Sequence, residues 1–115
     1  MRALGLILML TACTDLTYWK PSGRQPIEAK HIVRVDFPCG ERNLGCANLA
    51  GNTIELDRRL MKDEADCVIR HERKHFAGYD HPEYNWSSAA PIDCGDGTYF
   101  TLTPMRREVL SRSPM

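Results

Sequence analysis

Three of the four histidines lie between positions 71 and 81, and their spacing constrains the fold more than any other feature of the sequence. The segment reads HERKHFAGYDH. His71 and His75 are four residues apart, so on a helix their side chains lie on one face, one turn apart. Gly78 tolerates a left-handed backbone and can end the helix, which lets His81 turn back towards the other two. We therefore expect a helix and a tight turn that bring three imidazoles together.

The full pattern H-E-x-x-H-x-x-G-x-x-H is more specific than its parts. At this chain's composition, H-E-x-x-H alone is expected in about one such chain in a hundred, and the whole pattern at a frequency on the order of 10⁻⁵. The pattern resembles the zinc-binding signature of the metzincin metallopeptidases. The resemblance implies that His71, His75 and His81 bind Zn²⁺ and that Glu72 acts as general base. It also implies that the protein hydrolyses peptide bonds.

The rest of the chain departs from that family in two ways. Metzincins have a methionine-containing turn beneath the metal. The only counterpart after His81, apart from the terminal Met115, is Met105, for which an ordinary core or tail methionine is the favoured interpretation. Metzincin catalytic domains are also considerably longer than the roughly ninety residues available here. The expected fold is α+β: a small, minimal zincin-like domain with one active-site helix packed on a few short strands and braced by disulfides.

The remaining elements follow from local patterns. β-Branched residues and alternation predict a strand over His31–Phe37, and a weaker strand over Asn52–Leu56. Asp63 is a suitable N-cap, and apolar and histidine positions recur at spacings of three and four until Gly78, which predicts a helix of about four turns. A further strand is expected over Thr98–Thr103, followed by a basic tail.

The amino end predicts export. Residues Met1 to Cys13 read MRALGLILMLTAC, a basic start, an apolar middle and a small-residue end typical of a secretory signal. The apolar run is too short to span a membrane, which takes about 20 apolar residues. Its last four residues, LTAC, resemble the lipobox of bacterial lipoproteins. That resemblance implies cleavage after Ala12 and lipidation of Cys13.

This interpretation divides the chain into three parts. Residues 1–12 form the signal peptide, residues 13–26 the lipidated cysteine and a tether, and residues 27–115 the zinc-binding domain. Two or more acyl chains anchor a protein stably to a membrane. By resemblance to enteric lipoproteins, Thr14 after the cysteine favours the outer membrane. We therefore expect a lipid-anchored location in the bacterial cell envelope, at the outer membrane and facing the periplasm.

Setting Cys13 aside leaves four of the five cysteines: Cys39, Cys46, Cys67 and Cys94. An even number of cysteines in a small exported domain is most simply two disulfides. Three pairings are possible, and the sequence does not choose between them. We favour Cys39 with Cys46, which closes a short glycine-containing loop, and Cys67 with Cys94, which ties the histidine helix to a later loop.

Three histidines leave one coordination position for water, because structural zinc sites normally have four protein ligands. Cys67 lies eight residues before His75, about 12 Å along a helix, which is too far to share the ion. Water bound to zinc becomes acidic, and Glu72 would take its proton and pass it to the leaving amine. The side chains that could stabilise the oxyanion are weak candidates, none at a diagnostic position: Tyr84, Tyr99 and Arg106. Asp80 and Glu83 could orient an imidazole, although solvated surface carboxylates are the favoured interpretation.

Charge excludes one class of partner. The chain has 15 basic and 15 acidic residues and no long basic run, so it lacks the clustered Lys and Arg that nucleic-acid binding needs. Expected partners are a peptide or protein substrate and the membrane.

Two alternative functions stay open: a non-catalytic lipoprotein braced by zinc and disulfides that binds a partner, and a hydrolase of peptidoglycan cross-links. An unligated Glu72 beside the metal favours an enzyme, because a purely structural site has no use for it.

Overall fold

A computed structural model describes residues 18–82 and 91–114. In this part of the chain the elements, in order, are β1 (Lys20–Pro21), β2 (His31–Val35), the short 3-10 helix η2 (Pro38–Gly40), β3 (Gly45–Asn48), β4 (Thr53–Asp57), α2 (Lys62–Phe76), β5 (Tyr79–Asp80), β6 (Ile92–Asp93), β7 (Tyr99–Phe100) and α3 (Pro104–Ser111). The protein is thus a small mixed α+β structure, as expected. Neither described helix combines the length and apolar character needed to cross a membrane.

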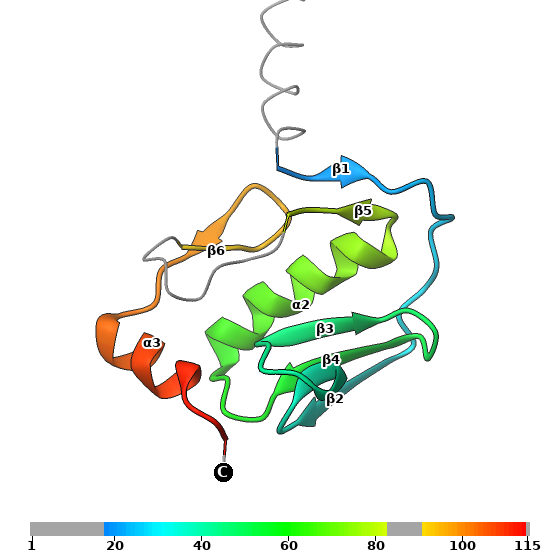
Figure 1. The fold of residues 1–115 in the computed structure, drawn as a ribbon. Coiled ribbons are helices and arrows are strands. Elements are labelled where there is room, and N and C mark those ends of the chain that lie inside the picture. Colours follow the sequence, from blue (N-terminus) through cyan, green and yellow to red (C-terminus); the bar gives the residue numbers. More distant parts are fainter. Residues whose placement is uncertain (1–17, 83–90, 115) are drawn as a thin grey trace, which may run out of the picture.

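Helix α2 lies centrally, between a three-stranded sheet and the shorter strands (Figure 1). The sheet has the order β2-β4-β3, with β2 parallel to β4 and β3 antiparallel to it. On β4, Ile54 and Leu56 alternate with more polar residues and are buried, because one face of the strand packs in the core. Val68 on α2 belongs to the same core cluster. This packing fixes α2 against β3 and β4.

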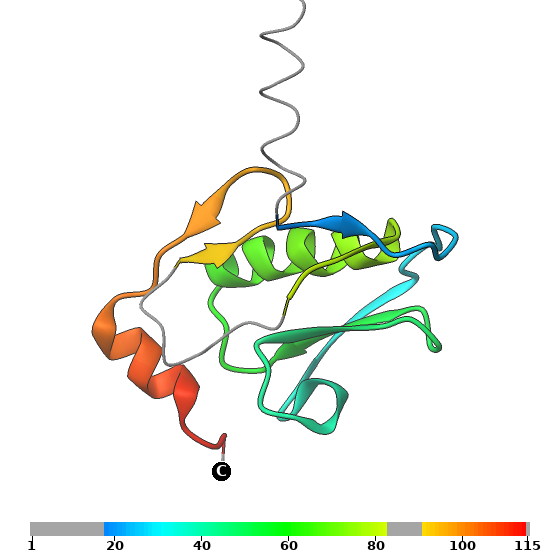
Figure 2. The ribbon, with the colours of Figure 1, turned by 45° about the horizontal axis from the view of Figure 1, so that its top comes forward.

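Two short antiparallel ladders border α2 on its other side. Strand β1 pairs with β5, with Lys20 opposite Asp80 and Pro21 opposite Tyr79, and both run close to α2 (Figure 2). Strand β6 pairs with β7. Gly78 has φ +102°, a conformation that favours glycine, so it ends the helix region as its position in the sequence predicts. The β1–β5 ladder therefore holds the segment that leads from this turn to His81.

Two disulfides are present, with the favoured pairing. Cys39 and Cys46 join the loop at η2 to β3. Cys67 and Cys94 join α2 to the segment after β6, with their Cα atoms 4.8 Å apart. The second bridge holds β6 beside the histidine-bearing helix, so it affects the geometry of the site as well as the stability of the fold.

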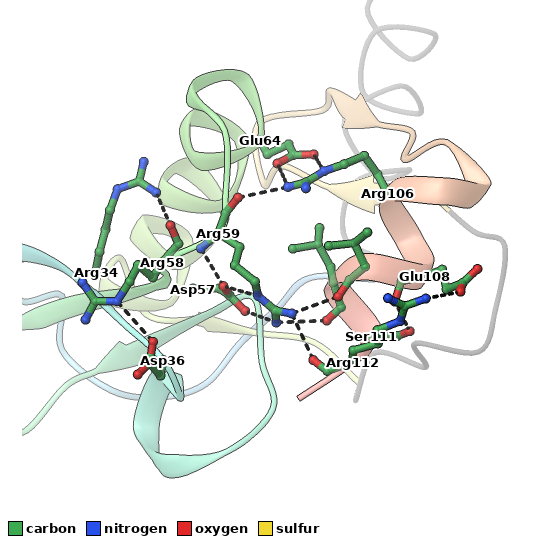
Figure 3. A network of polar contacts seen from close by, with 12 residues as sticks. Arg34, Asp36, Asp57, Arg58, Arg59, Glu64, Arg106, Glu108, Ser111 and Arg112 are labelled. Carbon is green, nitrogen blue, oxygen red and sulfur yellow. Dashed lines mark hydrogen bonds and ion pairs between the residues drawn. The ribbon is translucent and has the colours of Figure 1, made fainter. Parts of the chain in front are cut away.

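Helix α3 is attached to the rest of the molecule by two arginines (Figure 3). Arg106 donates to both carboxylate oxygens of Glu64 at the start of α2, over 2.6 and 2.9 Å. Arg59 is paired with Asp57 and donates to backbone carbonyls at the end of α3. Arg106 is therefore engaged in an ion pair with Glu64 and is not among the residues that line the cavity described below, and its expected role at the oxyanion stays an untested prediction.

Several expected boundaries differ from the structure. Helix α2 begins at Lys62 with Met61 as N-cap, and Asp63 lies in its first turn. This happens because the Glu64 carboxylate accepts the Met61 N–H over 2.8 Å and caps the helix two residues before the expected position. The expected strand over Thr98–Thr103 is limited to β7, because Thr103 instead caps α3, its hydroxyl accepting the N–H of Arg106.

Candidate metal centre

Three imidazoles meet at one point of the structure. His71 and His75 come from adjacent turns of α2, and His81 follows β5. One nitrogen of each ring lies within 4.8 Å of the corresponding nitrogens of the other two. The Nε2 atoms of His71 and His81 are 2.8 Å apart. The helix, the glycine turn and the β1–β5 ladder thus bring together the three histidines that the sequence pattern indicates.

Each of these rings points its other nitrogen, Nδ1, at a backbone carbonyl oxygen. The three pairs are His71 with Asp93 (2.6 Å), His75 with Tyr79 (2.9 Å) and His81 with Pro82 (2.5 Å). A carbonyl oxygen only accepts hydrogen bonds, so Nδ1 must carry the proton in all three rings. The carbonyls of Tyr79 and Pro82 come from the segment that follows the Gly78 turn, and that of Asp93 comes from β6.

This protonation pattern leaves a bare lone pair on the Nε2 atom of each neutral ring. Two such lone pairs, on His71 and His81, face each other at 2.8 Å and cannot form a hydrogen bond with one another. A cation between them would turn this repulsion into attraction. The donor set, three neutral imidazole nitrogens oriented by hydrogen bonds on their far side, is the arrangement found at histidine metal sites.

The protonation states of the imidazoles also fit metal binding. Burial lowers the pKa of His71 to about 4, against an opposing effect of its hydrogen bond to Asp93. Burial likewise lowers the pKa of His75, opposed by Asp80. Both rings are therefore neutral at pH 7, which is the form that binds a metal ion.

Asp80 has a more specific role than the surface position that the sequence favoured. Its Oδ1 atom accepts from Nδ1 of His75 over 3.1 Å, and Arg24 donates to both carboxylate oxygens over 2.7 and 3.0 Å. The hydrogen bonds from Arg24 are the main reason that the pKa of Asp80 falls to about 2. Asp80 is thus a fixed, ionised acceptor behind His75, and it stabilises the Nδ1–H tautomer of that ring.

Glu72 lies beside the three histidines but outside the ligand set. Its side chain is buried, with the residue 6% exposed. Burial raises the pKa of Glu72 to about 8, and a hydrogen bond from the backbone of Ala47 works against that rise. A Cβ atom at Gly45 would lie 3.1 Å from Oε2 of Glu72. The carboxyl group is therefore held against β3 with little free space.

A cavity of about 610 Å³ opens at this point. All three histidines and Glu72 line it, and the residues of β3 from Gly45 to Ala47 form part of its wall. Tyr18 and Arg24 line it from the amino-terminal segment. The cavity thus combines a cation-binding nitrogen cluster, a buried carboxyl group and the backbone of a strand at the edge of the described sheet.

Residues 18–26 fall within the expected tether, but the first of them are packed against the site. The ring of Tyr18 stacks on His81 with centroids 4.9 Å apart, and its hydroxyl lies 3.2 Å from Nδ1 of that histidine. Trp19 is buried beside all three histidines. The two adjacent aromatics in an otherwise polar segment are the only sequence signal that could have indicated this contact.

Other sequence-based candidates lie elsewhere. Cys67 is bonded to Cys94 and is no metal ligand, as its helical distance from His75 indicates. Tyr99 on β7 is 63% exposed, and Met105 on α3 is 78% exposed, and neither lines the cavity. Cys13, Tyr84, Glu83 and Met115, with the whole expected signal peptide, lie outside the described residues.

Comparisons with protein-family models, with curated proteins and with solved structures found no match.

Proposed function

We propose that this protein is an exported zinc-dependent peptidase that hydrolyses peptide bonds, with Glu72 as general base. One observation carries the proposal. Three imidazoles present unprotonated Nε2 atoms to a common point, and a buried carboxyl group that is not among them lines the same cavity. A purely structural metal site needs the three imidazoles but has no need of the buried carboxyl group.

The donor set favours zinc. Three neutral imidazoles suit Zn²⁺, and catalytic zinc sites typically have three protein ligands where structural sites have four. Among the described residues no fourth histidine, cysteine or carboxylate joins the cluster. When bound at such an open site, zinc acts as a Lewis acid that lowers the pKa of water and polarises a carbonyl group.

The chain's own residues supply the proton transfers. Glu72 accepts a proton from the attacking water and returns it to the leaving amine. This role needs the ionised carboxylate, which the charge of a nearby Zn²⁺ would favour against the burial that raises the pKa of Glu72 to about 8. The carboxyl group is fixed at the cavity by its burial and by the backbone of Ala47. His71, His75 and His81 keep their rings oriented through hydrogen bonds to backbone carbonyls, so the ligands need no rearrangement.

The edge of β3 supports a peptide as the substrate. The N–H of Asp57 on β4 donates to the carbonyl of Leu44 just before β3. Alternation along an antiparallel strand then directs the backbone groups of Gly45 and Ala47 away from β4. The Ala47 N–H is taken up by its hydrogen bond to Glu72, and the other outward-facing groups would bind an extended peptide by adding it as a further strand. This edge borders the cavity, so a peptide held on it would pass Glu72.

The proposed location follows from the amino-terminal sequence. A lipid on Cys13 would anchor the protein in the bacterial cell envelope, at the outer membrane and facing the periplasm, where proteins and peptidoglycan are both within reach. Peptidoglycan cross-links contain amide bonds open to the same chemistry, so they belong among the substrates to be assayed.

The experiment compares three forms of the full chain, exported through an oxidising compartment: wild type, Glu72→Gln, and Glu108→Gln as a control at an exposed glutamate on α3. Zinc content is measured together with hydrolysis of a peptide library and of purified peptidoglycan. All three should bind zinc, and Glu72→Gln should lose at least about 100-fold in kcat, as removal of a general base does. Absence of zinc would refute the site, and zinc without hydrolysis would favour the non-catalytic binding lipoprotein.

A further inference from the structure

We propose that Trp19 is a positioning residue for the metal ligands, its indole forming a base against which all three imidazoles pack. The centroid of the Trp19 ring lies 4.9 Å from His71, 5.0 Å from His75 and 4.6 Å from His81. The three contacts are edge-to-face, the favourable geometry for aromatic pairs. This inference rests on the proposed metal site but not on the site's being catalytic.

Trp19 is buried among residues of the candidate metal centre and does not belong to the main core cluster. Trp19 is 4% exposed, yet it is not a member of the core cluster that Ile54, Leu56 and Val68 form with nine other residues of the described chain. The described ring and cation contacts of Trp19 are with the three histidines, the adjacent ring of Tyr18 and the ammonium group of Lys74, which lies 5.6 Å from the centroid of the indole ring. Loss of the indole should therefore affect the histidines more than the fold.

The indole nitrogen gives a second indication that Trp19 is held in place by packing of its ring. Nε1 of Trp19 is buried and has no hydrogen-bond partner among the described residues. A buried unpaired donor costs about 1–3 kcal/mol. Packing of the ring, and not a hydrogen bond from its nitrogen, therefore accounts for the position of the indole, and all three histidines are among its packing partners.

One ladder positions both Trp19 and His81. Trp19 directly precedes β1, and His81 directly follows β5, the strand with which β1 pairs. Ser22 reinforces the ladder, because its N–H and its hydroxyl both donate to the carbonyl of Gly78 over 2.8 Å. Docking of the amino-terminal strand therefore brings the indole and the third ligand to the cluster together.

The physical role of the indole is to restrict rotation of the three imidazole rings. Each imidazole is held at Nδ1 by its hydrogen bond, and the indole blocks one side of the ring. Without it, a space would open next to all three rings, and they would have to be reordered when an ion binds. Removing groups that orient metal ligands typically lowers affinity by 10–100-fold. We expect this loss for Trp19→Ala, and a loss of no more than about threefold for Trp19→Phe, which keeps an aromatic ring.

The test measures Co²⁺ and Zn²⁺ dissociation constants and the Co²⁺ absorption spectrum for the full chain. The variants are Trp19→Ala, Trp19→Phe and, as a control, Leu110→Ala, which removes a buried side chain of the core cluster far from the histidines in sequence. Leu110→Ala should lower stability and leave both dissociation constants and the spectrum unchanged. Trp19→Ala should weaken both metals by at least tenfold and shift the Co²⁺ bands.

A fluorescence measurement covers the case in which Trp19→Ala does not fold. The chain has two tryptophans, so Trp86→Phe leaves Trp19 as the only one. One equivalent of Co²⁺ should then quench most of its emission, and the quenching should saturate together with the absorption bands. Binding of Co²⁺ without quenching, or unchanged affinity and spectrum in folded Trp19→Ala, would overturn this inference alone. Absence of metal binding by the unsubstituted chain would overturn the metal site and this inference with it.

Discussion

At the scale of single residues, the candidate site depends on groups that face away from the cluster. Each histidine of the cluster donates its Nδ1–H to a carbonyl, and His75 has a carboxylate acceptor as well, Asp80. Arg24 fixes that carboxylate in turn. The orientation of His75 is therefore coupled to an ion pair between the amino-terminal segment and β5.

Asp80→Ala should weaken zinc binding by about tenfold, because it removes an ionised acceptor that stabilises the metal-binding tautomer of His75. Competition with a chromophoric chelator measures the affinity. Asp36→Ala is the matched control, since Asp36 is also paired with an arginine, Arg58, at an exposed position. Equal zinc affinities for the two variants would show that Asp80 does not support the ligand.

The grouping of the three histidines with Glu72 was predictable because the proposed roles require particular side chains at fixed spacings. Their acceptors were not, since a backbone carbonyl can belong to any residue. The contact of Trp19 was also hidden, because it depends on a two-residue ladder between segments almost sixty positions apart, and so short a ladder leaves no periodic pattern in the sequence.

At the scale of elements, the close approach of β3 to α2 holds Glu72, the proposed general base, in place. Gly45 has no room for a side chain: an added Cβ atom would lie 2.3 Å from Cγ1 of Val68 and 3.1 Å from Oε2 of Glu72. The glycine therefore sets the distance between the sheet edge and the helix that carries the site.

Gly45→Ala should push β3 away from α2, at a cost of about 1–3 kcal/mol in stability, and should lower kcat while leaving zinc bound. Gly51→Ala is the control, because an added Cβ there would meet only Asn48 atoms at 3.4 Å or more. Urea unfolding and the peptidase assay measure the two effects. Full activity in a folded Gly45→Ala protein would contradict the proposed tight placement of Glu72.

The ion pair between Glu64 and Arg106 makes the attachment of α3 depend on pH. Burial alone would raise the pKa of Glu64, but hydrogen bonds from Arg106 and from the Met61 N–H, with the charge of Arg106, bring it below the ordinary value. A folded pKa below the unfolded one stabilises the protein above the unfolded value, about 4.3 for Glu. That contribution is lost as the pH falls through the folded pKa.

Arg106→Ala should lower the free energy of unfolding by roughly 3 kcal/mol at pH 7, because it leaves a buried carboxylate unpaired. At pH 3 the difference from wild type should be smaller, because protonation removes the charge on the carboxyl group of Glu64 in the variant. Urea unfolding at both pH values measures this. Arg112→Ala, at an exposed pair, should change stability by less than about 0.5 kcal/mol. If Arg106→Ala lowered the free energy of unfolding equally at pH 7 and pH 3, the proposed contribution of the Glu64–Arg106 ion pair to stability would be contradicted.

Prediction of elements succeeded where a pattern was long or distinctive. The 15-residue helix and the strands at positions 31 and 53 carry periodic or β-branched signals. Strand β3 reads GCAN, without a β-branched residue, and forms because it pairs with β4 and is tied by a disulfide. Helix α3 is short, and the sequence predicts only a basic tail there, since the long-range pairing of Arg106 that attaches the helix has no local signature.

At the scale of the whole molecule, the structure surrounds one cavity with short elements, two disulfides and three histidines. The proposed anchor would place that cavity close to a membrane. Trp19 lies six residues after Cys13, a span of at most about 20 Å for a fully extended chain. With a lipid on Cys13, the site would therefore act on substrates at or near the membrane surface.

X-ray absorption at the zinc edge, on the full chain loaded with one equivalent of Zn²⁺, tests the proposed open three-histidine site most directly. We predict three imidazole nitrogens and one further oxygen at about 2.0–2.1 Å. His81→Ala should reduce the number of imidazoles from three to two. A sulfur ligand at about 2.3 Å, a fourth imidazole or a spectrum unchanged by His81→Ala would contradict the site.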